Sequence, residues 1–113
     1  MLIRSQDKTI LLNFSNSTVD YIAKNGKDFV ILSLENENRY RLGKYSSEAK
    51  AMKVLDMIQE AYADAKLILM TVPNIGKMFA EAPASKENEL LAEAIGEMVK
   101  NKMVFQMPED SEV

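Results

Sequence analysis

The chain has 113 residues, a formal net charge of −3, and the hydrophobic and charged content of an ordinary globular domain. It contains no cysteine and no histidine, which excludes disulfides, thiolate chemistry and every catalytic arrangement that depends on a histidine base. This length predicts one domain, over residues 1–108, followed by an acidic tail over residues 109–113 that we expect to be mobile.

Neither the start of the chain nor its apolar runs predict a membrane segment. Met1 to Gln6 lack the long apolar core of a signal peptide. The longest apolar run, Leu67 to Val72, is too short to cross a bilayer. We therefore expect a cytoplasmic protein with no membrane partner, and the sequence predicts no cofactor and no small-molecule substrate.

The first third of the chain favours strands. Leu2 to Gln6 and Thr9 to Phe14 are apolar-rich runs that predict two short strands or one bent strand. Asn25-Gly26 then separates the apolar runs Val19 to Lys24 and Lys27 to Leu34. Asn-Gly readily adopts the positive φ angles of a type I′ turn, so this segment predicts a hairpin with a two-residue loop at Asn25-Gly26.

Both faces of this hairpin carry apolar residues. Alternation along the two strands predicts one face that we expect to lie under a helix, made of Val19, Tyr21, Val30, Leu32 and Leu34. The opposite face carries Ile22, Phe29 and Ile31. We expect that second face to be covered by the C-terminal half of the chain or by another subunit.

A strand over Arg39 to Tyr45 is predicted to lead directly into an amphipathic helix over residues 47–65, with Ser46 or Ser47 as its N-cap. The apolar residues of this helix, among them Ala51, Val54 and Ile58, recur at helical spacing on one stripe. The sequence therefore predicts an α+β fold in which an antiparallel meander of four to five strands is packed by this helix.

The second half of the chain predicts a second helix. Residues 67–72 suit either a strand or the end of the first helix, and Pro73 to Gly76 are expected to break that element. An amphipathic helix is predicted over Lys86 to Lys100, with Ser85 as its N-cap. A last short strand over Met103 to Met107 is expected to rejoin the sheet near the first strand.

Carboxylates are the only abundant candidates for catalysis or metal binding. They recur at every fourth residue along each predicted helix, as Asp56, Glu60 and Asp64 and as Glu89, Glu93 and Glu97. Two facing acidic rows would suit a hard cation, but such rows are typical of solvated helix faces. We therefore predict no catalytic residue, no metal ligand and no enzyme.

A basic group on the sheet suggests an alternative function. Arg4, Arg39, Arg41 and Lys44 are candidates for nucleic-acid binding. The turn Leu42-Gly43-Lys44-Tyr45 leading into a helix also resembles the arm-DNA-binding domains of phage integrases, which implies contact with nucleic acid through the sheet. The acidic balance of the chain argues against strong phosphate binding, which needs several uncompensated cations.

The leading expectation is a protein–protein contact. Met57 lies off the main apolar stripe, next to the row of acidic residues. Together with residues 67–72 and 75–79 it predicts an exposed apolar patch, which is typical of an interaction surface. The predicted interaction residues are therefore Met57 from this patch and Ile22, Phe29 and Ile31 from the second face of the predicted β-hairpin.

Three segments resemble a small uncharacterised family of phage and prophage proteins from Gram-positive bacteria. They are residues 1–8, residues 42–59 and residues 104–110. The resemblance implies a phage or host-cytoplasm setting and no particular activity. Taken together, the sequence favours a non-enzymatic interaction or structural module that forms homo-oligomers or binds a phage or host protein, with nucleic-acid binding as the alternative.

Overall fold

The computed structural model describes residues 1–17 and 19–113, and within them all side chains except those of Ile75 and Phe79. The elements in chain order are β1 (Leu2–Arg4), β2 (Leu11–Asn13), the 3-10 helix η1 (Phe14–Asn16), β3 (Val19–Asn25), β4 (Asp28–Glu35), β5 (Asn38–Tyr45), α1 (Glu48–Glu81), α2 (Lys86–Lys102), β6 (Val104–Gln106) and the 3-10 helix η2 (Asp110–Glu112). The fold is therefore α+β, as the sequence predicts.

The strands form two three-stranded sheets, and the prediction of a single meander of four to five strands is wrong. One sheet is an antiparallel meander with the order β3-β4-β5. The other has the order β2-β1-β6, in which β6 is parallel to β1. The return of the last strand to the first is confirmed. The N-terminal strands stay apart from the meander because the chain turns away after β2 through η1, which Asn13 caps with its side chain.

The β3–β4 hairpin turns one residue later than predicted. Asn25 pairs with Asp28, so the loop is Gly26-Lys27. Gly26 has a φ of 64°, whereas Lys27 is not in the positive-φ region, which fits a type II′ turn with glycine in the first position. The pairing therefore differs from the predicted register by two residues, and a shift by two keeps every side chain on its predicted face.

Helix α1 covers one face of the β3–β4 hairpin, and it is the face opposite to the one predicted. The described core is formed by Ile3, Leu12, Ile31, Leu42, Tyr45, Ala51, Val54, Ile58 and Met107, and Ile22 and Phe29 pack against it. Ile22, Phe29 and Ile31 therefore face α1, and Ile31 is completely buried. Alternation assigned the two sets of residues correctly, but both sets are apolar, so it could not show which set the helix covers.

A bulge in β5 selects the face that α1 covers. Ile31 pairs with Gly43 and Leu32 pairs with Arg41, so Leu42 is the extra residue. The bulge brings Gly43 and Tyr45 onto the inner face with Ile31. A Cβ at Gly43 would lie 3.0 Å from Tyr45 Oη, so a larger residue there would crowd the tyrosine ring.

The C-terminal segment, which the sequence describes as an acidic tail, is docked on the rest of the chain. Tyr45 Oη and Gln6 Nε2 both donate to the carbonyl oxygen of Pro108, at 2.8 and 3.1 Å. The Asp110 carboxylate accepts the Ser46 N–H at 2.8 Å and lies 3.4 Å from Lys50 Nζ. These contacts fasten residues 108–112 to the start of α1, because that end of the helix offers both an unpaired N–H and a cation.

Helix α1 is longer than predicted and continues through Pro73. Ser47 caps it, since its Oγ accepts the Lys50 N–H at 3.2 Å. The predicted break at Pro73 is wrong. Proline removes one backbone hydrogen bond, the one to the Leu69 carbonyl, and both Pro73 and Leu69 are exposed, so the helix loses this bond on an open side. Ser85 caps α2 as predicted, by accepting the Asn88 N–H at 3.1 Å.

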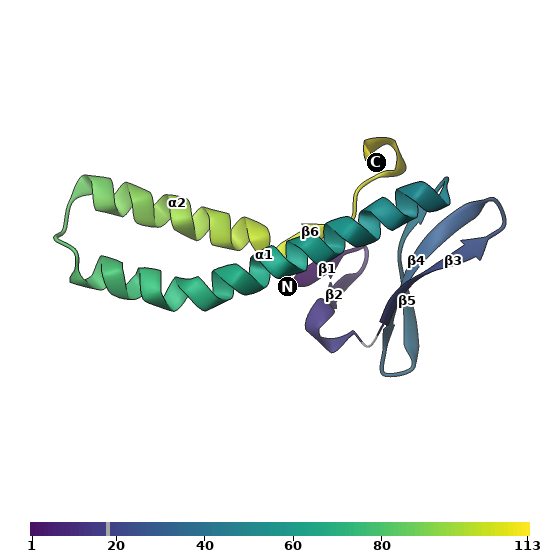
Figure 1. Ribbon diagram of the computed structural model, residues 1–113, viewed down its shortest axis with the longest axis horizontal. Coiled ribbons are helices and arrows are strands. Elements are labelled where there is room, and N and C mark those ends of the chain that lie inside the picture. The colour runs from purple at the N-terminus through teal and green to yellow at the C-terminus, as the bar shows by residue number, and fades with distance from the viewer. Residues whose placement is uncertain (18) are drawn as a thin grey trace.

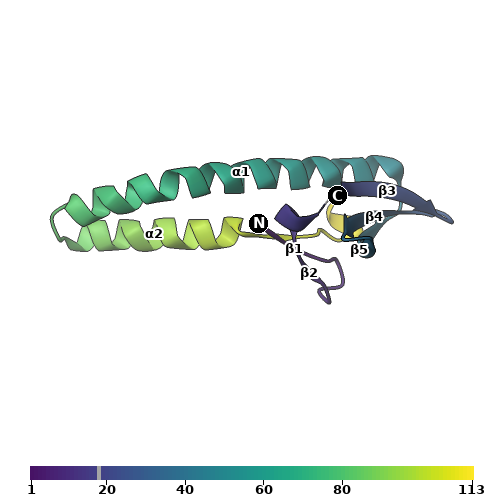
Figure 2. The ribbon, with the colours of Figure 1, turned by 90° about the horizontal axis from the view of Figure 1, so that it is seen from below.

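The two helices form a hairpin that extends away from the sheets (Figure 1). The first half of α1 lies across the sheets, and its second half runs beside α2 with no sheet near it, as Figure 2 also shows. The radius of gyration is 17.5 Å, against about 13 Å for a compact domain of this length. The helical hairpin accounts for the difference.

Candidate interaction surface

Few side chains of the helical hairpin are buried. Helix α2 has no buried residue. The half-buried side chains of the hairpin include Ile95 and Val99 on α2 and Ile68 and Val72 on α1, which fits the stripes along which the two helices meet. A two-helix hairpin can bury only one stripe of each helix, so its remaining apolar surface needs another cover.

Exposed apolar residues are concentrated on this hairpin. Among the side chains that the structure describes in residues 66–102, seven large apolar ones are exposed: Leu67, Leu69, Met70, Met78, Leu90, Leu91 and Met98. Leu67 and Met78 are 61% and 70% exposed. Exposed apolar residues scattered singly are normal, whereas a contiguous set marks an interaction site.

Helical spacing places four of these residues, Leu67, Met78, Leu91 and Met98, on one side of the helical hairpin, together with Thr71 and Ala94. We call these six residues the hairpin face. Asp64 lies on the α1 stripe that carries Leu67, Thr71 and Met78, and Lys102 lies on the α2 stripe that carries Leu91 and Met98. The Asp64 carboxylate is 3.7 Å from Lys102 Nζ. This ion pair shows that the two stripes lie on the same side. Leu69 is across the helix from Leu67 and continues the stripe that faces the sheets.

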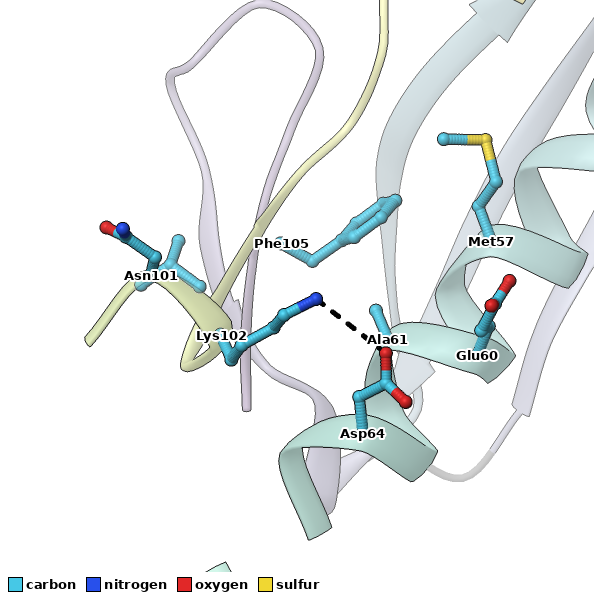
Figure 3. A pocket seen from close by; sticks show the side chains of 8 residues that line it. Met57, Glu60, Ala61, Asp64, Asn101, Lys102 and Phe105 are labelled. Carbon is cyan, nitrogen blue, oxygen red and sulfur yellow. Dashed lines mark ion pairs between the residues drawn. The ribbon is translucent and has the colours of Figure 1, made fainter. Parts of the chain in front are cut away.

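A groove extends the hairpin face toward the sheets (Figure 3). It has a volume of about 310 Å³. Its described lining comes from α1, from the end of α2 and from β6: Met57, Glu60, Ala61, Asp64, Asn101, Lys102, Val104 and Phe105. Met57 was predicted to contribute to an interaction surface, and the structure places it here, half-buried. Sequence reasoning missed Phe105, because its role depends on β6 lying beside α1.

The predicted interaction residues therefore separate into two groups. Ile22, Phe29 and Ile31 are used inside the chain, under α1. Met57 lies in the groove between α1, the end of α2 and β6. The exposed apolar residues of α2 were assigned by the sequence to a helix stripe, and the structure shows that this stripe is wider than the surface α1 covers.

The acidic rows do not converge. Asp64 is paired with Lys102, and Glu93 is exposed on α2. In the described part of the chain, no group of three or more acidic residues is arranged to hold a metal ion.

The four basic residues lie on two different sheets. Arg4 is in β1, and its Nε donates to the carbonyl oxygen of Lys8 at 3.3 Å. Arg39, Arg41 and Lys44 pair across β4 with Leu34, Leu32 and Val30, so they share the outer face of the meander, which α1 does not cover. Lys44 Nζ is 3.8 Å from the Asp28 carboxylate.

Three carboxyl groups have perturbed pKa values. Hydrogen bonds from Ser5 and Thr9 lower the pKa of Asp7 to about 2, with a smaller contribution from the charge of Arg41. The Ser46 N–H is the main cause that lowers the pKa of Asp110. Burial raises the pKa of Asp20, and the neighbouring Ser33 hydroxyl opposes this only in part. The first two groups hold turns and termini in place.

Asp20 is the exceptional carboxylate of the described chain. It lies on β3 between the apolar positions 19 and 22, and it lines cavities with Leu55 and Tyr62 of α1. Both of its carboxylate oxygens are buried without a hydrogen-bond partner among the described residues. Ser33 pairs with it across the strands, and the Ser33 and Ser17 hydroxyl oxygens are 2.8 Å apart, with either residue able to donate. Sequence alternation places Asp20 on the inner face, which is the signal that could have identified it.

None of the described helices is long and apolar enough to cross a membrane. Comparisons with models of protein families, with curated proteins and with solved structures found no match. The function must therefore be argued from the surface of the chain itself.

Proposed function

We propose that this protein is a non-enzymatic interaction module that associates with a second copy of itself through the hairpin face. The observation that carries the proposal is the exposed apolar side of a helical hairpin that extends beyond the sheets. The core of this face is free of charge: Leu67, Met78, Leu91 and Met98 surround small or uncharged neighbours, and Asp64 and Lys102 neutralise each other at its edge. Depletion of charge in the centre is typical of protein interfaces.

The size of the face suits a second copy. Helices of about 17 residues are about 25 Å long, and two of them side by side are about 20 Å wide. Together with the groove, such a surface buries on the order of 1,200 Å² when two copies meet, which is at the lower end of the range for stable interfaces. A homodimer with one hairpin from each copy would form a four-helix bundle, the arrangement in which helices with wide apolar stripes are normally buried.

A matched pair of substitutions tests the proposal. Leu67 and Leu69 are both exposed, at 61% and 55%, but they lie on opposite sides of α1. Light scattering of the unmodified protein should give twice the mass of one 12.7 kDa chain. Leu67→Glu should give the mass of a single chain with an unchanged circular dichroism spectrum, whereas Leu69→Glu should remain a dimer. A single-chain mass for the unmodified protein at every accessible concentration would refute self-association.

Nucleic-acid binding is the second candidate function, because Arg39, Arg41 and Lys44 lie together on the open face of the meander. Two of these cations have acidic neighbours: Asp28 lies beside Lys44, and the charge of Arg41 acts on Asp7. This compensation is why self-association is preferred. A DNA mobility shift that weakens with salt and disappears in the Arg39→Ala/Arg41→Ala variant would support the second function. No shift at low salt would remove it. A phage or host-cytoplasm setting stays part of the proposal for either function.

A further inference from the structure

The hairpin face is symmetric about its own middle. Leu67 and Met78 are equally far, in opposite directions, from a point between Val72 and Pro73. On α2, Leu91 and Met98 are equally far from a point between Ala94 and Ile95. Both midpoints are the same number of residues from the middle of the segment 82–85 that connects the helices. The two midpoints therefore lie at the same level of the hairpin.

This symmetry suits one of the two ways in which identical hairpins can meet face to face. When a two-fold axis crosses both helices at this level, each helix packs antiparallel against its own copy. Leu67 of one copy then meets Met78 of the other, and Leu91 meets Met98. When the axis instead runs parallel to the helices, each residue keeps its position along the hairpin in both copies. The symmetric spacing of the apolar residues would then have no effect on their contacts. Thr71 is the residue of the face closest to the crossing axis on α1.

The two-fold axis that crosses both helices also places a segment of the second copy near the groove. It brings the connecting segment 82–85 of one copy to the level of Ala61 in α1 and Phe105 in β6 of the other copy. Ala61 and Phe105 are residues that line the groove. The connecting segment contains Ala82, Pro83 and Ala84, which are small and uncharged. We infer that the groove lined by Met57, Ala61 and Phe105 is the seat for residues 82–84 of a second copy, in an antiparallel dimer of hairpins.

The charges and shape of the groove agree with this occupant. The Phe105 side chain points from β6 toward α1, and the half-buried Met57 also lines the groove (Figure 3). Glu60 is exposed, and the side chains of the ion pair between Lys102 and Asp64 are about half exposed. The apolar floor therefore receives a short apolar segment, and the paired charges remain at the rim, where water reaches them. Along α1, Met57, Asp64, Thr71 and Met78 recur at intervals of seven residues, so the groove and the hairpin face form one strip. Such a heptad interval is the spacing at which helices pack side by side.

This arrangement rests on the proposed self-association, but it makes predictions that self-association alone does not make. Cross-linking is clean in this protein, because the chain contains no cysteine. Glu60 and residue 84 of the same copy are about 35 Å apart along the hairpin, yet in the antiparallel dimer Glu60 of one copy lies near residue 84 of the other. Single-cysteine variants of full-length protein, treated with a short bismaleimide linker, distinguish the possible arrangements.

Four samples and one control are needed. The samples are Thr71→Cys, the mixture of Glu60→Cys with Ala84→Cys, Glu60→Cys alone and Ala84→Cys alone, and the control is Glu93→Cys. We expect cross-linked dimers from Thr71→Cys and from the mixture, and at least a tenfold lower yield from Glu60→Cys alone, Ala84→Cys alone and the Glu93→Cys control on the opposite side of α2. Light scattering on the same samples shows whether they are dimers before treatment.

Dimers in which Ala84→Cys cross-links to itself, or in which the mixture gives no product, would overturn the antiparallel arrangement and leave self-association intact. Samples that are single chains by light scattering, with no cross-link anywhere, would overturn both. Dimers that cross-link through Glu93→Cys would overturn the assignment of the hairpin face. As a check that does not depend on cysteine, Ala84→Asp should weaken dimerisation at least tenfold without changing the helical content.

Discussion

The two halves of α1 both carry an apolar stripe, but they have different surroundings. In the half over residues 48–65, Ala51, Val54 and Ile58 are buried against the two sheets. In the half over residues 66–81, Leu69 continues the same stripe and is exposed, because the sheets do not reach it. An amphipathic pattern indicates that one side of a helix is packed against a partner, but it does not show whether that partner belongs to the same chain.

The largest expected effect separates the two halves by stability. Ile58→Ala removes a side chain that is 2% exposed in the core, so it should lower the free energy of unfolding by about 2–5 kcal/mol. Leu69→Ala in the other half should change it by less than about 0.5 kcal/mol. Urea denaturation of both variants, monitored by circular dichroism, measures the difference. Equal losses would show that both halves are covered within one chain.

The next effect concerns the hydrogen bond that fastens the C-terminal segment beside the start of α1. Tyr45→Phe removes the buried hydrogen bond from Tyr45 Oη to the Pro108 carbonyl, while Gln6 still donates to that oxygen. The expected loss of stability is about 1 kcal/mol. Proteolysis near residue 108 should also become faster, because the hydroxyl fastens the C-terminal segment beside α1. No change in either measurement would mean that Asp110 alone holds this segment.

A third prediction concerns Asp20, under the covered half of α1. Its pKa is raised by burial, so the folded state binds the proton more tightly than the unfolded state. The stability that this proton contributes is fully present below the unfolded pKa, near 4, and is lost as the pH rises through the folded pKa. Asp20→Asn should therefore stabilise the protein at pH 7 by about 1 kcal/mol, and this gain should shrink as the pH falls toward 4. A gain that is constant from pH 7 to pH 4 would contradict the assignment to Asp20.

The smallest effect lies in a turn far from both halves and serves as a control. Asn36 and Glu37 have φ angles of 47° and 70° between β4 and β5, which fits a type I′ turn. Glycine adopts positive φ without strain, so Glu37→Gly should stabilise the fold by about 0.5–1 kcal/mol. Thermal melting should show this gain in dimers and single chains alike. A change in oligomeric state would be unexpected, because the turn lies far from the hairpin face.

Local signals in the sequence predicted much of the fold. The caps at Ser47 and Ser85, the strands of the meander and the return of β6 to β1 all follow from short patterns, and the structure confirms them. The side of the meander that α1 covers could not be predicted, since it depends on the bulge at Leu42 and on the ring of Tyr45 filling the space above Gly43.

The candidate surface was predictable only in part. The sequence singled out Met57, but the rest of the groove comes from residues far away in the chain, such as Phe105. The length of α1 was not predicted, because the rule that proline ends a helix takes no account of an exposed proline inside a long helix. With α1 ended early, the exposed apolar residues beyond it could not be assigned to one face.

Hydrogen exchange, read by mass spectrometry of peptides, compares the two halves of α1 in one experiment. The unmodified protein is labelled well above and well below its dimer dissociation constant. Residues 66–81 should exchange slowly at the high concentration and at least tenfold faster at the low one, because dissociation uncovers the hairpin face. Residues 48–65 should exchange equally slowly at both concentrations. Identical exchange of residues 66–81 at the two concentrations would contradict the claim that a second copy covers this half of the helix.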